Sequence, residues 1–329
     1  MTLLGLLFPL ICVGTIVSMD PSFTQTLPCW VWLLSWFADF WYQTIDAIDG
    51  KQARRTDNCS PLGQILDHNL DQITFTTMMI HVCSTLRINN DIVRILLITP
   101  GVMSAHYSIE YRTHFTHMHQ TVIGFIGATE QLLFVQAGTL ACFFYPTSNE
   151  MFAIKFAVPG TDNFEISFGD IVILFSFLTG VHYNIENILV SFCKAKEKGY
   201  ALGCTIPYIQ FFIMMYASSY SALFKDYPAY FLILNGLYLT WITAIFNLCS
   251  TSSSKYNWLF LEPFVYLSMV YCEHAGLVEQ KAAGFFYTGF LLFIIIRYLL
   301  FMNNIVNQIT TYMGLRFLLV KDKKVDPTE

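Results

Sequence analysis

Long apolar stretches are the feature that most constrains how this chain can fold. A helix needs roughly 20 mainly apolar residues to cross the hydrocarbon core of a bilayer, and about ten segments meet or approach that length. They lie at roughly 2–19, 30–48, 68–86, 91–110, 122–145, 169–192, 203–223, 228–249, 258–273 and 283–302. The sequence therefore predicts an all-α, polytopic membrane protein with about ten transmembrane helices.

The charge content supports this interpretation. Only 12% of the 329 residues are charged, against about 25% in soluble domains. The net charge of −5 is small, and Lys and Arg form no basic stripe of the kind that binds nucleic acid. We therefore expect membrane lipids, and no nucleic acid, among the partners.

We predict one integral-membrane domain over residues 1–329, because the chain shows no internal repeat and no low-complexity linker. The one long polar insert, 147–167, contains Pro159 and Gly160 and is predicted to be a loop. Residues 1–19 lack the basic start and small-residue cleavage site of a signal peptide, so we interpret them as a retained helix. The nine cysteines lack zinc-type spacing, which favours reduced thiols.

Lys and Arg residues predict the orientation, because cytosolic loops carry an excess of both. If the N-terminus is cytosolic, ten spans place the larger set on the cytosolic face: Lys51, Arg54, Arg55, Arg112, Lys194, Lys196, Lys198, Lys255, Lys321, Lys323 and Lys324. The opposite face has the smaller set: Arg87, Lys155, Lys225 and Lys281. This asymmetry favours cytosolic termini and a cytosolic loop between the second and third helices.

Four aspartates flank that loop. Asp46 and Asp49 are three residues apart at the end of one helix, and Asp67 and Asp71 are four apart at the start of the next. Both spacings place side chains on one helix face, so the two pairs should face each other at one membrane boundary. Four close carboxylates repel each other, and their oxygens suit hard divalent cations. A solvated helix end is the alternative for any single aspartate.

Three neighbouring residues suit a phosphate ligand. Gly50 and Gly63 leave room for close approach of a ligand, and Arg54 offers a planar fork for a diphosphate. Together with the aspartates, they suit in-line displacement at phosphorus, in which metals bind the attacking and leaving oxygens.

The complete pattern D-x2-D-G-x2-A-R-x8-G-x3-D-x3-D, from Asp46 to Asp71, resembles the signature of the CDP-alcohol phosphotransferase family. Its flanks, including Ser60-Pro61-Leu62 and His68, are similar to the eukaryotic choline/ethanolamine phosphotransferase branch. A weaker similarity covers most of the chain and includes Ile296-Arg297-Tyr298.

This resemblance implies a ten-helix enzyme of the endoplasmic reticulum or Golgi with a cytosolic active site. It would transfer phosphocholine or phosphoethanolamine from CDP-choline or CDP-ethanolamine to diacylglycerol and release CMP. It is also compatible with a homodimer. Two Mg²⁺ or Mn²⁺ ions would be held by Asp46, Asp49, Asp67 and Asp71. The CDP-alcohol would be bound by Asp49, Gly50, Ala53, Arg54 and Gly63.

The resemblance leaves two residues for the general base. In many family members the fourth aspartate of the motif, here Asp71, is assigned as the base. In this branch the histidine after the third aspartate, here His68, is a better match, with a glutamate on a later helix matched to Glu130. A metal-bound Asp has a lowered pKa and is a poor base, whereas His titrates near neutrality. We predict that His68 is the base and Glu130 orients it, with Asp71 as the alternative.

Several functional alternatives stay open. A phosphatidylinositol synthase type of enzyme is usually shorter, and a transporter tends to hold its carboxylates near the bilayer midplane between repeats. An inactive relative kept for scaffolding is a further alternative, since relatives carry an additional segment ahead of the first helix. Choline and ethanolamine are not distinguished, because Asn69 and Gln72 replace a common Gly and Ser.

Overall fold

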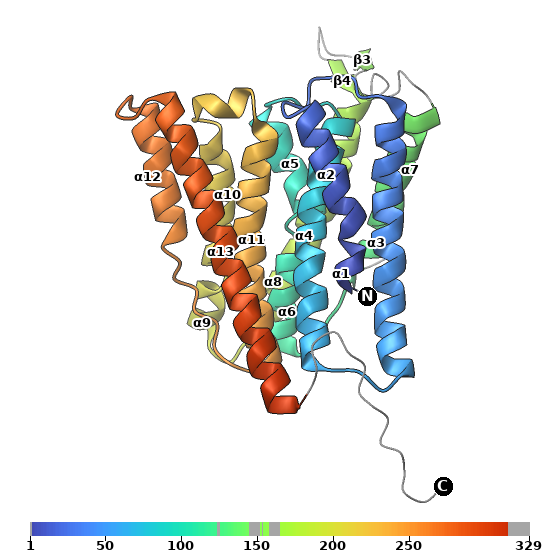
Figure 1. The fold of residues 1–329 in the computed structure, drawn as a ribbon, viewed down its shortest axis with the longest axis vertical. Coiled ribbons are helices and arrows are strands. Elements are labelled where there is room, and N and C mark those ends of the chain that lie inside the picture. Colours follow the sequence, from blue (N-terminus) through green and yellow to red (C-terminus); the bar gives the residue numbers. More distant parts are fainter. Residues whose placement is uncertain (1, 124–125, 145–151, 153, 158–164, 315–329) are drawn as a thin grey trace, which may run out of the picture.

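The computed structural model describes residues 2–123, 126–144, 152, 154–157 and 165–314, and it is a bundle of long helices (Figure 1). The helices are α1 (Thr2–Gly5), α2 (Leu7–Met19), α3 (Cys29–Arg55), α4 (Pro61–Thr85), α5 (Ile92–Val102), α6 (Ala105–Thr116), α7 (Ala128–Phe144), α8 (Phe168–Lys194), α9 (Lys198–Gly203), α10 (Ile206–Ser218), α11 (Pro228–Thr251), α12 (Glu262–His274) and α13 (Gln280–Met313). A 3₁₀ helix spans Ala222–Lys225.

The strands form two short antiparallel hairpins. β1 (Val122–Ile123) pairs with β2 (Ile126–Gly127), and β3 (Lys155–Ala157) pairs with β4 (Glu165–Ser167). The second hairpin lies inside the segment predicted to be a loop. Pro159 and Gly160 of that loop lie outside the described residues, as do the C-terminal lysines used in the orientation argument.

The predicted all-α membrane class is confirmed. Six described segments are long and apolar enough to cross a membrane, judged by length and composition alone: Thr2–Met19, Ile92–Thr116, Phe168–Lys194, Lys198–Ser218, Pro228–Thr251 and Gln280–Met313. All ten apolar stretches coincide with helices, but the count of ten spans stays a prediction. One boundary is wrong, because Val122–Ile123 and Ile126–Gly127 form the β1–β2 hairpin and the helix begins only at Ala128.

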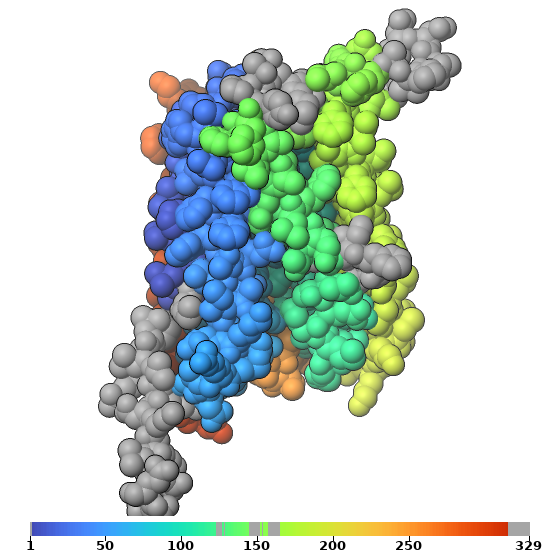
Figure 2. Space-filling model, turned by 90° about the vertical axis from the view of Figure 1, so that its right-hand side faces the viewer, coloured from blue at the N-terminus to red at the C-terminus, as the bar shows by residue number. Residues whose placement is uncertain are grey.

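α4 is the central helix of the bundle and is buried along most of its length. It packs against α2, α3, α11 and α13. On the face seen in Figure 2, α7 lies between α3 and α8. None of the nine cysteines, all within the described ranges, forms a disulfide in the structure.

The basic residues predicted to share one face lie at one end of the bundle where the structure describes them. In Figure 1 this lower end contains the turn from α3 to α4 and the ends of α8 and α13. The β3–β4 hairpin, which carries Lys155, lies at the opposite end. The four aspartates therefore lie near the more basic end.

α5 and α8 pack in close contact at two glycines. A Cβ added to Gly180 would collide with the backbone of Gly101, and one added to Gly101 would collide with Ser176. Small residues allow helix backbones to approach in this way. The Asn184 amide adds a hydrogen bond across the contact, donating to the Pro100 carbonyl at 3.1 Å.

We predict that Gly180→Ala destabilises the protein by about 1–3 kcal/mol, the usual cost of overpacking a tight contact. Gly138→Ala on α7 is the matched control, because a Cβ there would meet nothing within 4 Å. Thermal unfolding of both purified variants in detergent checks this prediction. Equal melting temperatures would show that α5 and α8 can separate at little cost.

Candidate active site

A short turn brings the end of α3 against the start of α4. Asp57, in this turn, has a positive φ of 55°, a conformation that Asp tolerates better than most residues. α4 then begins with Pro61 at its first position, and Ser60 caps it by accepting a hydrogen bond from the Gly63 backbone N–H at 3.1 Å. The sequence therefore encodes a sharp helix start, which directs the aspartates of α4 towards those of α3.

Three of the predicted aspartates converge as expected. Carboxylate oxygens of Asp46, Asp49 and Asp67 all lie within 4.8 Å of one another. The Thr2 hydroxyl donates to Asp49 at 2.7 Å. Asp67 Oδ1 is buried without a hydrogen-bond partner.

This cluster fits a divalent cation. Buried carboxylate oxygens that lack a partner are costly, and a hard cation would satisfy them. Asp71 lies one helix turn beyond Asp67, and one of its oxygens accepts a hydrogen bond from the Tyr42 hydroxyl. The structure thus groups three of the four predicted ligands and places the fourth on the same face of α4, bound to a tyrosine.

All five residues predicted to bind the CDP-alcohol line one cavity of about 770 Å³ beside the cluster. They are Asp49, Gly50, Ala53, Arg54 and Gly63. α6 and α11 complete the wall with Thr113, Ser250 and Thr251. A Cβ on Gly50 would lie 3.5 Å from Arg54, an ordinary contact, so the glycine is not required by helix packing and instead widens the cavity.

His68 is buried beside the aspartates and is paired with a carboxylate. Its Nδ1 lies 2.7 Å from Oε1 of Glu110, which has no solvent exposure. With a proton on Nδ1 shared with Glu110, Nε2 is the basic nitrogen. The pair has the base-and-orienter geometry expected of a catalytic histidine.

The expected contact between His68 and Glu130 is not formed. Glu130 lies in the first turn of α7, is exposed, and accepts a hydrogen bond from the Gly127 backbone N–H at 2.8 Å. The helix begins at Ala128 rather than near residue 122, so Glu130 occupies its N-terminal turn, where a carboxylate is favoured. In this structure Glu110 makes the contact expected of Glu130.

Sequence reasoning missed Glu110 and His106, although both interrupt an otherwise apolar stretch. His106 Nε2 lies 3.9 Å from Glu110 Oε1. His119, which follows α6, packs its ring on His68 with centroids 4.3 Å apart. Partial burial, with a smaller contribution from His68, lowers the pKa of His119 to about 4, so its ring is neutral at pH 7.

Comparisons with known proteins find similarity to one protein family over about the first half of the chain. Residues 2–159 match the family model described as CDP-alcohol phosphatidyltransferase. Cholinephosphotransferase 1 of Bos taurus is 44% identical over 79 residues, covering 24% of this chain and 20% of the relative. Cholinephosphotransferase 1 of Saccharomyces cerevisiae is 31% identical over 181 residues, covering 54% of this chain and 45% of the relative.

One relative aligns along nearly the whole chain. An uncharacterised CDP-alcohol phosphatidyltransferase class-I family protein of Dictyostelium discoideum is 26% identical over 326 residues, covering 94% of this chain and 80% of the relative. The mammalian alignments, by contrast, span about a fifth of those relatives.

Proposed function

We propose, because residues 2–159 match the CDP-alcohol phosphatidyltransferase family model, that this chain transfers phosphocholine from CDP-choline to diacylglycerol and releases CMP. CDP-ethanolamine is the alternative donor. The observation that carries this proposal is the complete aspartate motif, three of whose four carboxylates converge beside a cavity lined by Arg54.

The donor would lie in the 770 Å³ cavity between α3, α4 and α11. Arg54 is suited to pair with the diphosphate, and Asp46, Asp49, Asp67 and Asp71 would hold two Mg²⁺ or Mn²⁺ ions. Such ions neutralise charge on the diphosphate and on the leaving group. Gly50 and Gly63 line the cavity without a side chain, which leaves room for the donor.

The position of the acceptor, diacylglycerol, is suggested by the face of α4 that carries Asp67 and Asp71. Asp67, Asp71, Phe75, Met78 and Val82 follow one another at three- and four-residue spacing, which is one helix face. The last three line an apolar cavity of about 250 Å³ between α4, α5, α7 and α8. An acyl chain in this cavity would place the diacylglycerol hydroxyl near His68.

The proposed reaction is a single displacement at phosphorus. The diacylglycerol hydroxyl oxygen forms a bond to the phosphorus of the phosphocholine group, and the bond from that phosphorus to the CMP oxygen breaks. His68 Nε2 accepts the hydroxyl proton, while Glu110 holds Nδ1 at 2.7 Å. Asp71 is the alternative base.

A radiolabelled transfer assay tests this proposal. The purified protein would receive CDP-choline or CDP-ethanolamine with diacylglycerol and Mg²⁺ or Mn²⁺. We expect labelled phospholipid and one equivalent of CMP with at least one donor. Absence of product with both donors would favour the scaffolding or transporter alternatives, and product only with CDP-diacylglycerol and an alcohol would favour the phosphatidylinositol synthase type.

We also propose that the site faces the cytosol of the endoplasmic reticulum or Golgi, because the basic residues share its end of the bundle. Asn58-Cys59-Ser60 is a glycosylation sequon, and a cytosolic Asn58 should stay unmodified in eukaryotic cells. Glu165→Thr, which completes a sequon at the opposite end, is the positive control. A glycosidase-sensitive mobility shift mapped to Asn58 would place the active site in the lumen.

A further inference from the structure

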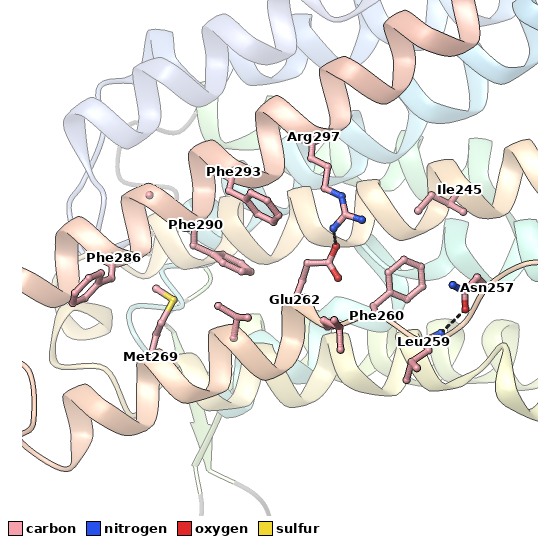
Figure 3. A pocket seen from close by; sticks show the side chains of 13 residues that line it. Ile245, Asn257, Leu259, Phe260, Glu262, Met269, Phe286, Phe290, Phe293 and Arg297 are labelled. Atoms are coloured by element: carbon pink, nitrogen blue, oxygen red, sulfur yellow. Dashed lines mark hydrogen bonds and ion pairs between the residues drawn. The ribbon is translucent and has the colours of Figure 1, made fainter. Parts of the chain in front are cut away.

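A second large cavity lies outside the matched domain, between α11, α12 and α13 (Figure 3). Its volume is about 690 Å³, within the range of roughly 300–1,000 Å³ that is typical of ligand sites. One face of α13 forms its long wall, because Phe286, Gly289, Phe293 and Arg297 follow at helical spacing.

The cavity is apolar at one end and has its charged side chains near the middle. In Figure 3, Phe286 and Met269 lie at the apolar end, the Arg297 and Glu262 side chains lie between Phe293 and Phe260, and the uncharged Asn257 lies at the far end. Phe286 and Arg297 are 11 residues apart on α13, which is about 16 Å at 1.5 Å per residue. An amphipathic molecule with an extended tail matches this distribution.

The charged region of the cavity contains both a cation and an anion. Arg297 pairs with Glu262, which is 5% exposed and lies in the first turn of α12. The Arg297 side chain remains 46% exposed, and its guanidinium lies 4.8 Å from the centre of the Trp241 ring. A zwitterionic group suits this region, because its phosphate can meet the guanidinium while its ammonium meets the carboxylate and nearby aromatic rings.

This cavity is separate from the proposed active site. Met302 and Ile305, on another face of α13, pack against Leu62 and Ile65 of α4, and the Asn69 amide contacts Met302 Sδ at 3.2 Å. This packed layer lies between α13 and the helix that carries Asp67. The diacylglycerol acceptor also lacks the charges that the Arg297–Glu262 pair would recognise.

We propose that this cavity binds one zwitterionic glycerophospholipid, with its phosphate at Arg297 and an acyl chain along Gly289 and Phe286. The proposal rests on the amphipathic cavity and its ion pair, and it stands independently of the transfer reaction. An anionic phospholipid is disfavoured because the Glu262 carboxylate opposes its net charge.

Native mass spectrometry of the full chain in detergent micelles tests the site, with phosphatidylcholine and phosphatidylglycerol added in equal amounts. Gly289→Phe should fill the cavity, since a Cβ at Gly289 meets nothing within 4 Å. We expect one phosphatidylcholine fewer per chain than in the wild type. Gly14→Phe, at an equally open position on α2, should keep the wild-type number.

A charge variant tests headgroup recognition. Glu262→Gln leaves the Arg297 charge uncompensated, so the retained lipid should change from phosphatidylcholine towards phosphatidylglycerol. Retention unaffected by Gly289→Phe, or a lipid ratio unaffected by Glu262→Gln, would overturn the proposal. A disulfide between two copies of a Gly289→Cys variant would also overturn it, since a second chain would then occupy the groove.

Discussion

Replacing Asp67 by alanine should abolish transfer, with a loss of about 10³-fold or more. Asp67 contributes to the cluster with Asp46 and Asp49, and its Oδ1 is buried without a protein partner. A bound metal stabilises charge in the transition state by several kcal/mol, and each 1.4 kcal/mol or so changes the rate tenfold. The measurement is the initial rate with CDP-choline at saturating Mn²⁺ or Mg²⁺.

Asp57→Asn is the matched control for this loss. Asp57 belongs to the adjacent turn, is exposed, and does not line the donor cavity, so its charge should be dispensable. Asn also tolerates the positive φ of this position. EDTA should inactivate the wild type as Asp67→Ala does, and added Mn²⁺ should restore only the wild type. Full activity in excess EDTA would rule out the two-metal proposal.

The carboxylate cluster could be predicted from sequence because it depends on local geometry. Helical spacing brings Asp46 and Asp49 onto one face and Asp67 and Asp71 onto another, and a short turn between two helix ends leaves few ways to arrange them. The residues that line the cavity beside the cluster could be predicted for the same reason, since Gly50 and Arg54 lie on the helix turn next to these aspartates. The helix positions also follow from local apolar composition.

The partner of His68 could not be predicted in this way. Glu110 is 42 residues away from His68, and their contact depends on how α6 is placed against α4. Pro100 lies inside α5, and the helix is interrupted after Val102, before α6 begins at Ala105. This interruption changes the direction of the segment that carries Glu110. An acid within a predicted apolar span was the available signal, because such residues are usually functional.

His68→Ala should lower kcat by about 10²–10⁴-fold, the usual contribution of general-base catalysis. Binding of CDP-choline should change little, because His68 does not line the donor cavity in the described structure. Asp71→Asn should behave differently, since it removes a predicted metal ligand and should be partly rescued by high Mn²⁺. Rates at several metal concentrations, with donor affinity measured separately by equilibrium binding, distinguish the two variants.

The two glutamates test which carboxylate orients the base. Glu110→Gln should lower kcat less than His68→Ala, because the amide oxygen can still accept a hydrogen bond from Nδ1. It removes the negative charge that stabilises a protonated His68, so some loss should remain. Glu130→Gln should keep near-normal kcat, since Glu130 contacts the Gly127 backbone instead. A large loss in Glu130→Gln with none in Glu110→Gln would restore the original pairing. Near-normal kcat in His68→Ala, with Asp71→Asn inactive at every metal concentration, would make Asp71 the base.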